Sequence, residues 1–322
     1  MNEAMNIDRA WEGDNQDWWD WYVRLADNPV QPPALVDAAL PDSPVASDTQ
    51  VFDELRRPYK LAEDDIAGFR RNGYVRLRGV LSDPVALRLR YELKALLERA
   101  FSVRLDGGVR DRFLSLEMVW LEHPLIRAFV LSPRVAGIGA RLLGVPALRL
   151  YHDNVLSKEP GCGRTPWHYD DTHFPLATQD VVTAWIPGQA IPAAMGPLAF
   201  AAPIDTYRLV EDLRFNTEDS SYDRAIADTL AGHGVFVDDR PFELGEVSFH
   251  HNLSLHTAAA NATRLSRIVL ANTYFADGAR VVDSPTLISG DWQKFMPGVA
   301  PGDVAASSLN PVCWPSPEAL WS

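Results

Sequence analysis

The chain has 322 residues, of which 47% are hydrophobic and 23% are charged, and these fractions exclude a disordered, collagen-like or coiled-coil chain. Because 43 Asp and Glu residues outnumber 30 Lys and Arg residues, the net charge of −13 repels phosphate backbones, and we expect no nucleic-acid partner. The two cysteines, Cys162 and Cys313, fit neither a disulfide framework nor a zinc or redox motif. No apolar run approaches about 18 residues and residues 1–9 carry no signal pattern, so we expect a soluble, cytoplasmic protein with no membrane partner.

The first 50 residues differ in composition from the rest of the chain. Aromatic residues crowd into a short acidic segment, and a Pro-rich stretch, residues 29–44, follows; the aromatic residues are Trp11, Trp18, Trp19, Trp21 and Tyr22. We interpret residues 1–50 as a Trp-rich arm followed by a Pro-rich linker. Residues 51–322 then form a single domain.

Regular patterns begin near Leu61 and start with helices. Acidic residues at 63–65 begin a helix that ends at Asn72-Gly73, and residues 74–77 alternate as a short strand. Ser82-Asp83-Pro84 begins a second helix with a broad leucine face. A further helical region spans residues 124–143 and ends at Gly144.

Short β-type runs separated by Gly and Pro follow the helices, at residues 147–157, 181–186, 198–201, 246–249 and 267–275. This order favours an α+β fold, mainly β, in which a helical layer buttresses an antiparallel sandwich or barrel. The polar, partly helical segment at about 205–241 lies between two strands. We therefore expect it to be a lid-like insertion over one end of the barrel.

One short sequence has the pattern of a metal site, Thr165-Pro166-Trp167-His168-Tyr169-Asp170-Asp171. Residues i and i+2 of a strand point to the same face, so His168 and Asp170 can both reach one ion. A distal histidine would complete a set of two histidines and one carboxylate, which leaves three positions of an octahedral ion open. Such a set suits a non-haem Fe(II) that binds a cosubstrate and O2 together. The His-x-Asp pattern alone is weak, because it also occurs by chance.

The downstream sequence supplies a specific candidate for the distal ligand. A strand and turn, residues 245–255, end at His256, and Asn261, Thr263 and Arg267 follow it at offsets of 5, 7 and 11. Together with the His-x-Asp pattern, this arrangement resembles the phytanoyl-CoA dioxygenase family of Fe(II)- and 2-oxoglutarate-dependent oxygenases. The resemblance runs from about Leu61 to Phe275 and includes Gly73-Tyr74-Val75, Leu142-Leu143-Gly144, Lys158-Glu159-Pro160-Gly161, Ala184-Trp185-Ile186 and Gly196-Pro197-Leu198.

The resemblance implies a double-stranded β-helix, which is a cupin-like jelly roll, with the metal at its open end. His168, Asp170 and His256 match the iron ligands of the family and form the catalytic set. Arg267 matches the arginine that pairs with the distal carboxylate of 2-oxoglutarate, a role that suits a planar, two-pronged donor with a permanent charge. The implied cofactors are Fe(II), 2-oxoglutarate as cosubstrate, and O2.

Three further residues match positions that contact the cosubstrate in relatives, namely Trp185, Asn154 and Tyr169. Trp185 is equally consistent with a plain core tryptophan, and residue types vary at the other two positions. Arg264 competes with Arg267 as the cosubstrate anchor, but it precedes the strand and does not match the family offset.

Other titratable residues near these motifs have simpler interpretations. Asp171 points to the opposite strand face from Asp170, and we interpret it as a structural group. His173 lines either the substrate pocket or its rim. His250 and His251 precede a turn, and we expect them to pack or to bond to the backbone.

The chain also departs from the family pattern. Many relatives carry Pro-Gly-Ser-His after the Gly-Pro-Leu strand, whereas this chain reads Ala201-Ala202-Pro203-Ile204-Asp205. A small hydroxylated residue often follows the distal histidine by two positions, where this chain has Ala258. These changes affect the substrate side, so the substrate of a relative does not transfer directly to this protein.

The sequence thus predicts an Fe(II)- and 2-oxoglutarate-dependent dioxygenase that hydroxylates an unactivated C–H bond of a small organic molecule or natural-product intermediate, with succinate and CO2 as coproducts. Desaturation, epoxidation and ring formation by the same oxidative chemistry stay open, as does a non-catalytic jelly-roll protein that binds metal or ligand. Asp170 disfavours a related halogenase, and a zinc hydrolase would leave Arg267 without a role. The sequence predicts neither the substrate nor the oligomeric state.

Overall fold

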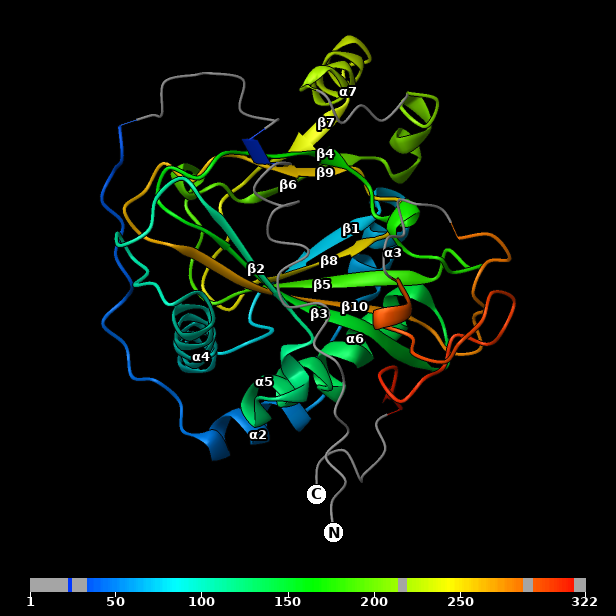
Figure 1. Cartoon of the computed structure of the whole chain (residues 1–322), viewed down its shortest axis with the longest axis horizontal. Coiled ribbons are helices and arrows are strands. Elements are labelled where there is room, and N and C mark those ends of the chain that lie inside the picture. The colour runs from blue at the N-terminus through cyan, green and yellow to red at the C-terminus, as the bar shows by residue number, and fades with distance from the viewer. Residues whose placement is uncertain (1–22, 25–33, 214–218, 286–291, 316–322) are drawn as a thin grey trace.

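The computed structural model describes residues 23–24, 34–213, 219–285 and 292–315, and two antiparallel sheets dominate this part of the chain (Figure 1). The major sheet has the strand order β1 (Tyr74–Leu77), β8 (Val247–His251), β5 (Val181–Pro187), β10 (Arg267–Ala276), β3 (Leu148–Lys158) and β11 (Val312–Trp314), and β2 (Phe113–Glu117) also pairs with β3. The minor sheet has the order β4 (Thr165–His168), β9 (His256–Ala258), β6 (Leu198–Ala202) and β7 (Phe236–Asp238). The predicted α+β, mainly β jelly roll is confirmed.

A helical layer covers the outer face of the major sheet, as predicted, and it consists of α2 (Asp48–Arg56), α3 (Glu63–Asn72), α4 (Asp83–Phe101), α5 (Pro124–Val130) and α6 (Pro133–Leu143) (Figure 1). In α4, Val85, Leu89, Leu93 and Leu97 recur every four residues and are all buried. This spacing produces one apolar stripe, which packs toward β10. No helix among the described residues is long and apolar enough to cross a membrane.

The helical region predicted over residues 124–143 is two helices, because Pro133 begins a new one. The hydroxyl of Ser132 accepts a hydrogen bond from the Val135 amide at 3.2 Å, which caps the start of α6. Helix α3 ends at Gly73, whose φ of 81° favours glycine, so the predicted stop at Asn72-Gly73 is confirmed.

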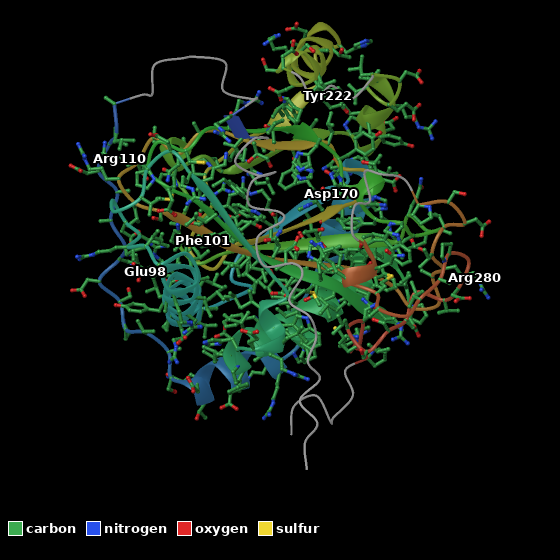
Figure 2. All side chains as sticks on the ribbon, viewed as in Figure 1. Glu98, Phe101, Arg110, Asp170, Tyr222 and Arg280 are labelled. Carbon is green, nitrogen blue, oxygen red and sulfur yellow. The ribbon has the colours of Figure 1, made fainter. Side chains whose placement is uncertain are left out.

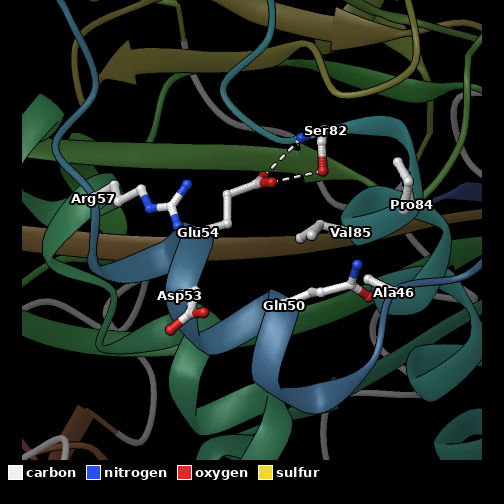
Figure 3. Close-up of a pocket in the computed structure, with 8 residues that line it drawn as sticks. All are labelled: Ala46, Gln50, Asp53, Glu54, Arg57, Ser82, Pro84 and Val85. Atoms are coloured by element: carbon white, nitrogen blue, oxygen red, sulfur yellow. Dashed lines mark hydrogen bonds between the residues drawn. The ribbon is translucent and has the colours of Figure 1, made fainter.

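A carboxylate from α2 fixes this helix against the start of α4 (Figure 3). Glu54 accepts hydrogen bonds from the Ser82 amide at 2.7 Å and from the Ser82 hydroxyl at 2.6 Å. Ser82 is the residue that precedes α4, so Glu54 supplies an acceptor for an otherwise unpaired donor of that helix. The contact ties the helical layer together across 28 residues of sequence.

The segment at 205–241 contributes both to a sheet and to its cover. Helix α7 (Ser221–Gly232) packs on β4, where Asp223 accepts a hydrogen bond from the Trp167 amide at 2.7 Å. In Figure 1 it lies on the outer side of the minor sheet, together with the 3₁₀ helix at Ile204–Leu209. Near the end of the segment, β7 pairs with β6 as an edge strand. A lid role for the remainder stays a prediction.

The aromatic residues of the predicted N-terminal arm lie outside the described residues. Part of the predicted linker is described, and there Val36 forms a parallel bridge with Thr263, in the loop that follows β9. Its amide donates to the Ala262 carbonyl at 2.8 Å. This segment therefore lies along a loop between the distal histidine and Arg267.

A second, smaller core fills the space between the two sheets. It contains Trp185, Val269 and Ala271 from the major sheet, together with Leu198 and Phe200 from the minor sheet. The rings of Tyr74 on β1 and Phe200 on β6 stack with 4.4 Å between their centroids and 8° between their planes. These contacts set the separation of the sheets on which the candidate site is built.

Candidate metal centre and cosubstrate site

Two histidines meet where β4 pairs with β9. His168 ends β4 and His256 begins β9, and the two residues are register partners, with 4.1 Å between ring centroids. The Nδ1 atom of His168 lies 2.8 Å from the Pro166 carbonyl, and that of His256 lies 2.9 Å from the Ser254 carbonyl. Since a carbonyl oxygen only accepts, both Nδ1 atoms carry the proton, and the lone pairs are on Nε2. Histidines held in this way are suited to bind a metal through Nε2.

Asp170 supplies a carboxylate to the same space. Its Oδ1 atom lies 3.8 Å from the Nε2 atom of His168 and 3.9 Å from that of His256. The candidate ligand atoms of the three residues all lie within 4.8 Å of one another, close enough to bind one ion. Figure 2 shows Asp170 in the interior, between the minor and the major sheet. The structure thus brings together the three residues that the sequence predicts as ligands.

The protonation states of this cluster suit metal binding. Burial lowers the pKa of the His168 and His256 imidazoles, which keeps both rings neutral and their lone pairs available. Burial opposes ionisation of Asp170, but the neighbouring His256 and His250 hold the pKa of its carboxyl well below the usual range. Two neutral imidazoles and one carboxylate are a donor set that fits Fe(II).

Arg267 begins β10 and points into the space between the sheets. It is 2% exposed, and its Nη1 atom donates to the Gly196 carbonyl at 2.7 Å. No carboxylate of the described residues pairs with it, and its buried Nε atom has no hydrogen-bond partner there. Burial lowers the pKa of the guanidinium to about 10, which still leaves it charged at neutral pH. A buried cation with an unused donor fits an anionic ligand such as the distal carboxylate of 2-oxoglutarate.

Trp185 and Asn154 lie in one row across the major sheet, because each is the register partner of Ala271. The Arg267 guanidinium carbon is 5.4 Å from the centroid of the Trp185 ring. Asn154 accepts a hydrogen bond from the Ser115 hydroxyl at 2.9 Å, and the residue is 7% exposed. Trp185 is therefore a neighbour of the arginine, and Asn154 belongs to the same sheet surface.

Tyr169 has different neighbours from the other predicted cosubstrate contacts. It packs against a cluster that contains Trp167 and Leu255, and its ring lies 5.9 Å from that of Tyr207. Its predicted contact with 2-oxoglutarate stays a prediction.

Asp171 is structural, as expected, because it accepts a hydrogen bond from the Asn252 side chain at 2.6 Å.

One of two neighbouring histidines makes a contact that the sequence did not predict. His251 has the expected backbone role, since its Nδ1 accepts from the Leu253 amide at 3.2 Å. His250, however, lies with its Nε2 atom 3.4 Å from Oδ2 of Asp170. Strand alternation in β8 directs Val247 and Phe249 outward to the helical core and His250 inward. Alternation over residues 247–251 predicts that His250 faces inward, but it does not predict the contact with Asp170.

Two further histidines lie near the cluster. The His173 amide donates to the Asp170 carbonyl at 2.9 Å, and its own buried Nδ1 atom has no partner among the described residues. His152 was missed by the sequence analysis, although it shares a strand face with Asn154. Its ring stacks on that of Phe295 with 4.6 Å between centroids.

Arg264 does not approach the cluster, because its side chain is 59% exposed and pairs with Asp37 at 3.2 Å.

Comparisons with known proteins agree with this geometry. The family model described as Phytanoyl-CoA dioxygenase (PhyH) matches residues 69–269, which is more than half of the chain. The solved structure of the non-heme alpha ketoglutarate dependent carbocyclase SnoK from nogalamycin biosynthesis is similar, with 26% identity and a TM-score of 0.63, covering 80% of this chain and 99% of that chain. A search of curated proteins found no match.

Two more distant structures share the fold. The epimerase SnoN in complex with Fe3+, alpha ketoglutarate and nogalamycin RO is 23% identical, with a TM-score of 0.60, and covers 78% of this chain and 98% of that chain. EctD from S. alaskensis with bound Fe is 17% identical, with a TM-score of 0.57, and covers 85% of this chain and 93% of that chain.

The fold, the ligand cluster and the family match define a non-haem iron enzyme that depends on 2-oxoglutarate and O2. The chain belongs to the phytanoyl-CoA dioxygenase family. The predicted family and the predicted cofactors are thereby confirmed, and so is the prediction of an enzyme over a non-catalytic binding protein.

Proposed function

We propose that this protein hydroxylates an unactivated C–H bond of a small organic molecule, such as a natural-product intermediate. His168, Asp170 and His256 hold the iron through two Nε2 atoms and one carboxylate oxygen. Arg267 binds the distal carboxylate of 2-oxoglutarate, with Trp185 beside it. Bound Fe(II), together with 2-oxoglutarate and O2, supplies an oxidant strong enough to break a C–H bond, and succinate and CO2 are the coproducts.

The observation that best supports this proposal is the buried guanidinium of Arg267, whose Nε atom has no hydrogen-bond partner among the described residues. A metal-binding protein or a zinc hydrolase needs only the three ligands and leaves this cation uncompensated, which is costly in a dry interior. An anionic cosubstrate that also bound the iron would compensate the charge of Arg267 and accept a hydrogen bond from its Nε atom. Asp170 supports hydroxylation over halogenation, because its carboxylate occupies the position that a halide would need.

The remaining residues of the site position and shield the reacting groups. Neutral His168 and His256 are oriented by the carbonyls of Pro166 and Ser254, which would hold both rings in place for an ion. The apolar core between the sheets excludes water from the side of Trp185 and Val269. Exclusion of water strengthens the Arg267–carboxylate pair and protects the reactive centre.

Ring formation is the second candidate function. The similarity to the carbocyclase SnoK, at 26% identity over nearly the whole of that chain, favours it specifically. Desaturation and epoxidation require the same oxidising centre and differ only in where the substrate radical or double bond is held.

A substrate panel tests both candidates. Iron-loaded protein is incubated with 2-oxoglutarate and candidate natural-product intermediates, succinate formation is measured, and products are analysed by mass spectrometry under ¹⁸O2. Hydroxylation adds one labelled oxygen atom to the substrate, whereas ring formation or desaturation removes two hydrogen atoms and adds no oxygen. Succinate formation that no substrate stimulates, together with no product under any condition, would contradict the proposed function.

A further inference from the structure

His250 is the nearest side chain to Asp170 that the ligand set does not include. It lies on β8 with its side chain 3% exposed, and its Nε2 atom is 3.4 Å from Oδ2 of Asp170. The other oxygen, Oδ1, is the one that faces the two ligand histidines, at 3.8 Å and 3.9 Å. The two oxygens of one carboxylate therefore have different neighbours.

The surroundings of the three imidazoles indicate two different tautomers. His168 and His256 carry their protons on Nδ1, where each ring meets a backbone carbonyl. The Nδ1 atom of His250 is buried and has no partner among the described residues. A proton there would be buried without an acceptor, and a lone pair on Nε2 would face the lone pairs of Oδ2. The opposite tautomer avoids both costs, so we infer that the proton of His250 is on Nε2, the ring nitrogen that lies 3.4 Å from Oδ2 of Asp170.

We propose that His250 is a positioning residue that occupies Oδ2 of Asp170 and thereby restricts the carboxylate to binding iron through Oδ1 alone. This inference rests on the iron site of the proposed function. It assigns His250 the role of a donor to a ligand, in contrast with His168 and His256, whose Nε2 atoms are the ligands themselves.

Binding through one oxygen preserves the coordination positions that the reaction needs. An octahedral ion with three protein donors keeps three positions, two for 2-oxoglutarate and one for O2. If Asp170 bound through both oxygens, only two positions would remain, and chelated 2-oxoglutarate would fill them. Loss of the His250 contact should therefore impair the reaction with O2 more than the binding of 2-oxoglutarate.

The number of water molecules on bound Mn(II) tests this role without relying on activity. Three variants are compared with the wild type, in the absence of 2-oxoglutarate: His250→Phe removes the donor, His250→Gln replaces it with an amide N–H at a similar reach, and His251→Phe removes the neighbouring imidazole on the opposite strand face. Electron–nuclear double resonance in ¹⁷O-labelled water counts the water ligands. We expect three in the wild type, in His250→Gln and in His251→Phe, and two in His250→Phe.

Kinetics provide a second readout that a merely structural role would not separate. In His250→Phe we expect the apparent KM for 2-oxoglutarate to stay within about threefold of the wild type, while kcat falls by at least about tenfold and is restored in His250→Gln. Equal losses in both His250 variants, or an unchanged water count in His250→Phe, would overturn the inference while leaving the iron site intact. A wild type that binds no Mn(II) would overturn the iron site as well.

The tautomer itself is measurable in the wild-type protein, independently of how the variants fold. ¹⁵N spectra of the histidine side chains, assigned by the loss of one ring signal in His250→Gln, distinguish a protonated Nε2 from a protonated Nδ1. We expect His250 to be protonated at Nε2 and both ligand histidines at Nδ1. Protonation of His250 at Nδ1 would contradict the proposal.

Discussion

His168 and His256 lie opposite each other across the β4–β9 ladder, and each ring donates from Nδ1 to the carbonyl of the residue two positions earlier in the chain, Pro166 and Ser254 respectively. Both imidazoles are thus oriented by local backbone, and their Nε2 atoms face the same point. The cluster is therefore preorganised for a metal ion before the ion arrives.

Removal of either ring should abolish iron binding and turnover. In His168→Ala and His256→Ala we expect the affinity for Fe(II) to fall by about 10-fold to 100-fold or more, because only two ligands remain. Anaerobic metal titration measures the affinity, and succinate formation measures turnover. His233→Ala is the matched control, since that histidine is exposed at the end of α7. Near-native succinate formation in either ligand variant would show that the ligand assignment is wrong.

Asp170→Ala should end hydroxylation and free one coordination position. We expect loss of oxygenated product, measured by mass spectrometry, with chloride added to the buffer to detect any chlorinated product. Loss of oxygenation is the firmer expectation, because a halide also needs its own polar neighbours. Asp171→Ala is the control, because the Asp171 carboxylate accepts a hydrogen bond from the Asn252 side chain. Unchanged hydroxylation in Asp170→Ala would contradict the assignment of Asp170 as a ligand and would make Asp171 the next candidate.

Arg267→Ala should retain iron and lose 2-oxoglutarate. We expect the apparent KM for 2-oxoglutarate to rise by at least about tenfold, which corresponds to about 1.4 kcal/mol, because the buried carboxylate loses its two-pronged partner. Arg264→Ala, which removes an exposed arginine paired with Asp37, should change it much less. Anaerobic titration of the Fe(II) protein follows the visible charge-transfer band of chelated 2-oxoglutarate. Saturation at equal concentrations in Arg267→Ala and wild type would refute the anchor role.

Asp153 on β3 should make stability depend on pH. It is fully buried, its Oδ1 atom has no partner among the described residues, and its register partner Asn272 also has an unpartnered side-chain oxygen. Burial raises the pKa of the Asp153 carboxyl to about 7. In the folded state it therefore keeps a proton that the unfolded chain releases above about pH 4, so the free energy of unfolding falls as pH rises toward 7.

Asp153→Asn removes this titration and supplies an N–H that can donate toward Asn272. We expect the variant to gain stability relative to the wild type as pH rises from about 5.5 to 8, by roughly 2 kcal/mol. Urea unfolding at several pH values measures the difference, with the exposed Asp239→Asn as control. A stability difference that stays constant with pH would contradict the prediction.

The candidate ligands could be predicted because their signal is local. His168 and Asp170 stand two positions apart at the end of a strand, and His256 ends a recognisable strand and turn. Arg267 was predictable for the same reason, since alternation in β10 places it on the same face as Val269 and Ala271, and the structure has both in the inner core. Helix α4 was predictable from its broad leucine face, whereas α2 precedes the first regular pattern and was not predicted.

The residues that sequence reasoning missed depend on pairing between distant strands. His250 reaches Asp170 only because β8 lies beside β5 in the major sheet, whereas Asp170 follows a strand of the minor sheet. Strand β7 was hidden in a polar segment because it is an edge strand, and Phe236 is 64% exposed there. Neither pairing is visible in the local composition.

The iron ligands and the cosubstrate anchor belong to different sheets, so the separation of the sheets can be changed without replacing either. The minor sheet carries His168 and His256, while the major sheet carries Arg267 and Trp185. The distance between the ligand cluster and Arg267 therefore depends on the separation of the two sheets. The stacked rings of Tyr74 and Phe200 help to determine that separation. Replacing Tyr74 and Phe200 with larger or smaller side chains should therefore change which length of oxo acid binds best, while the three candidate ligands stay the same.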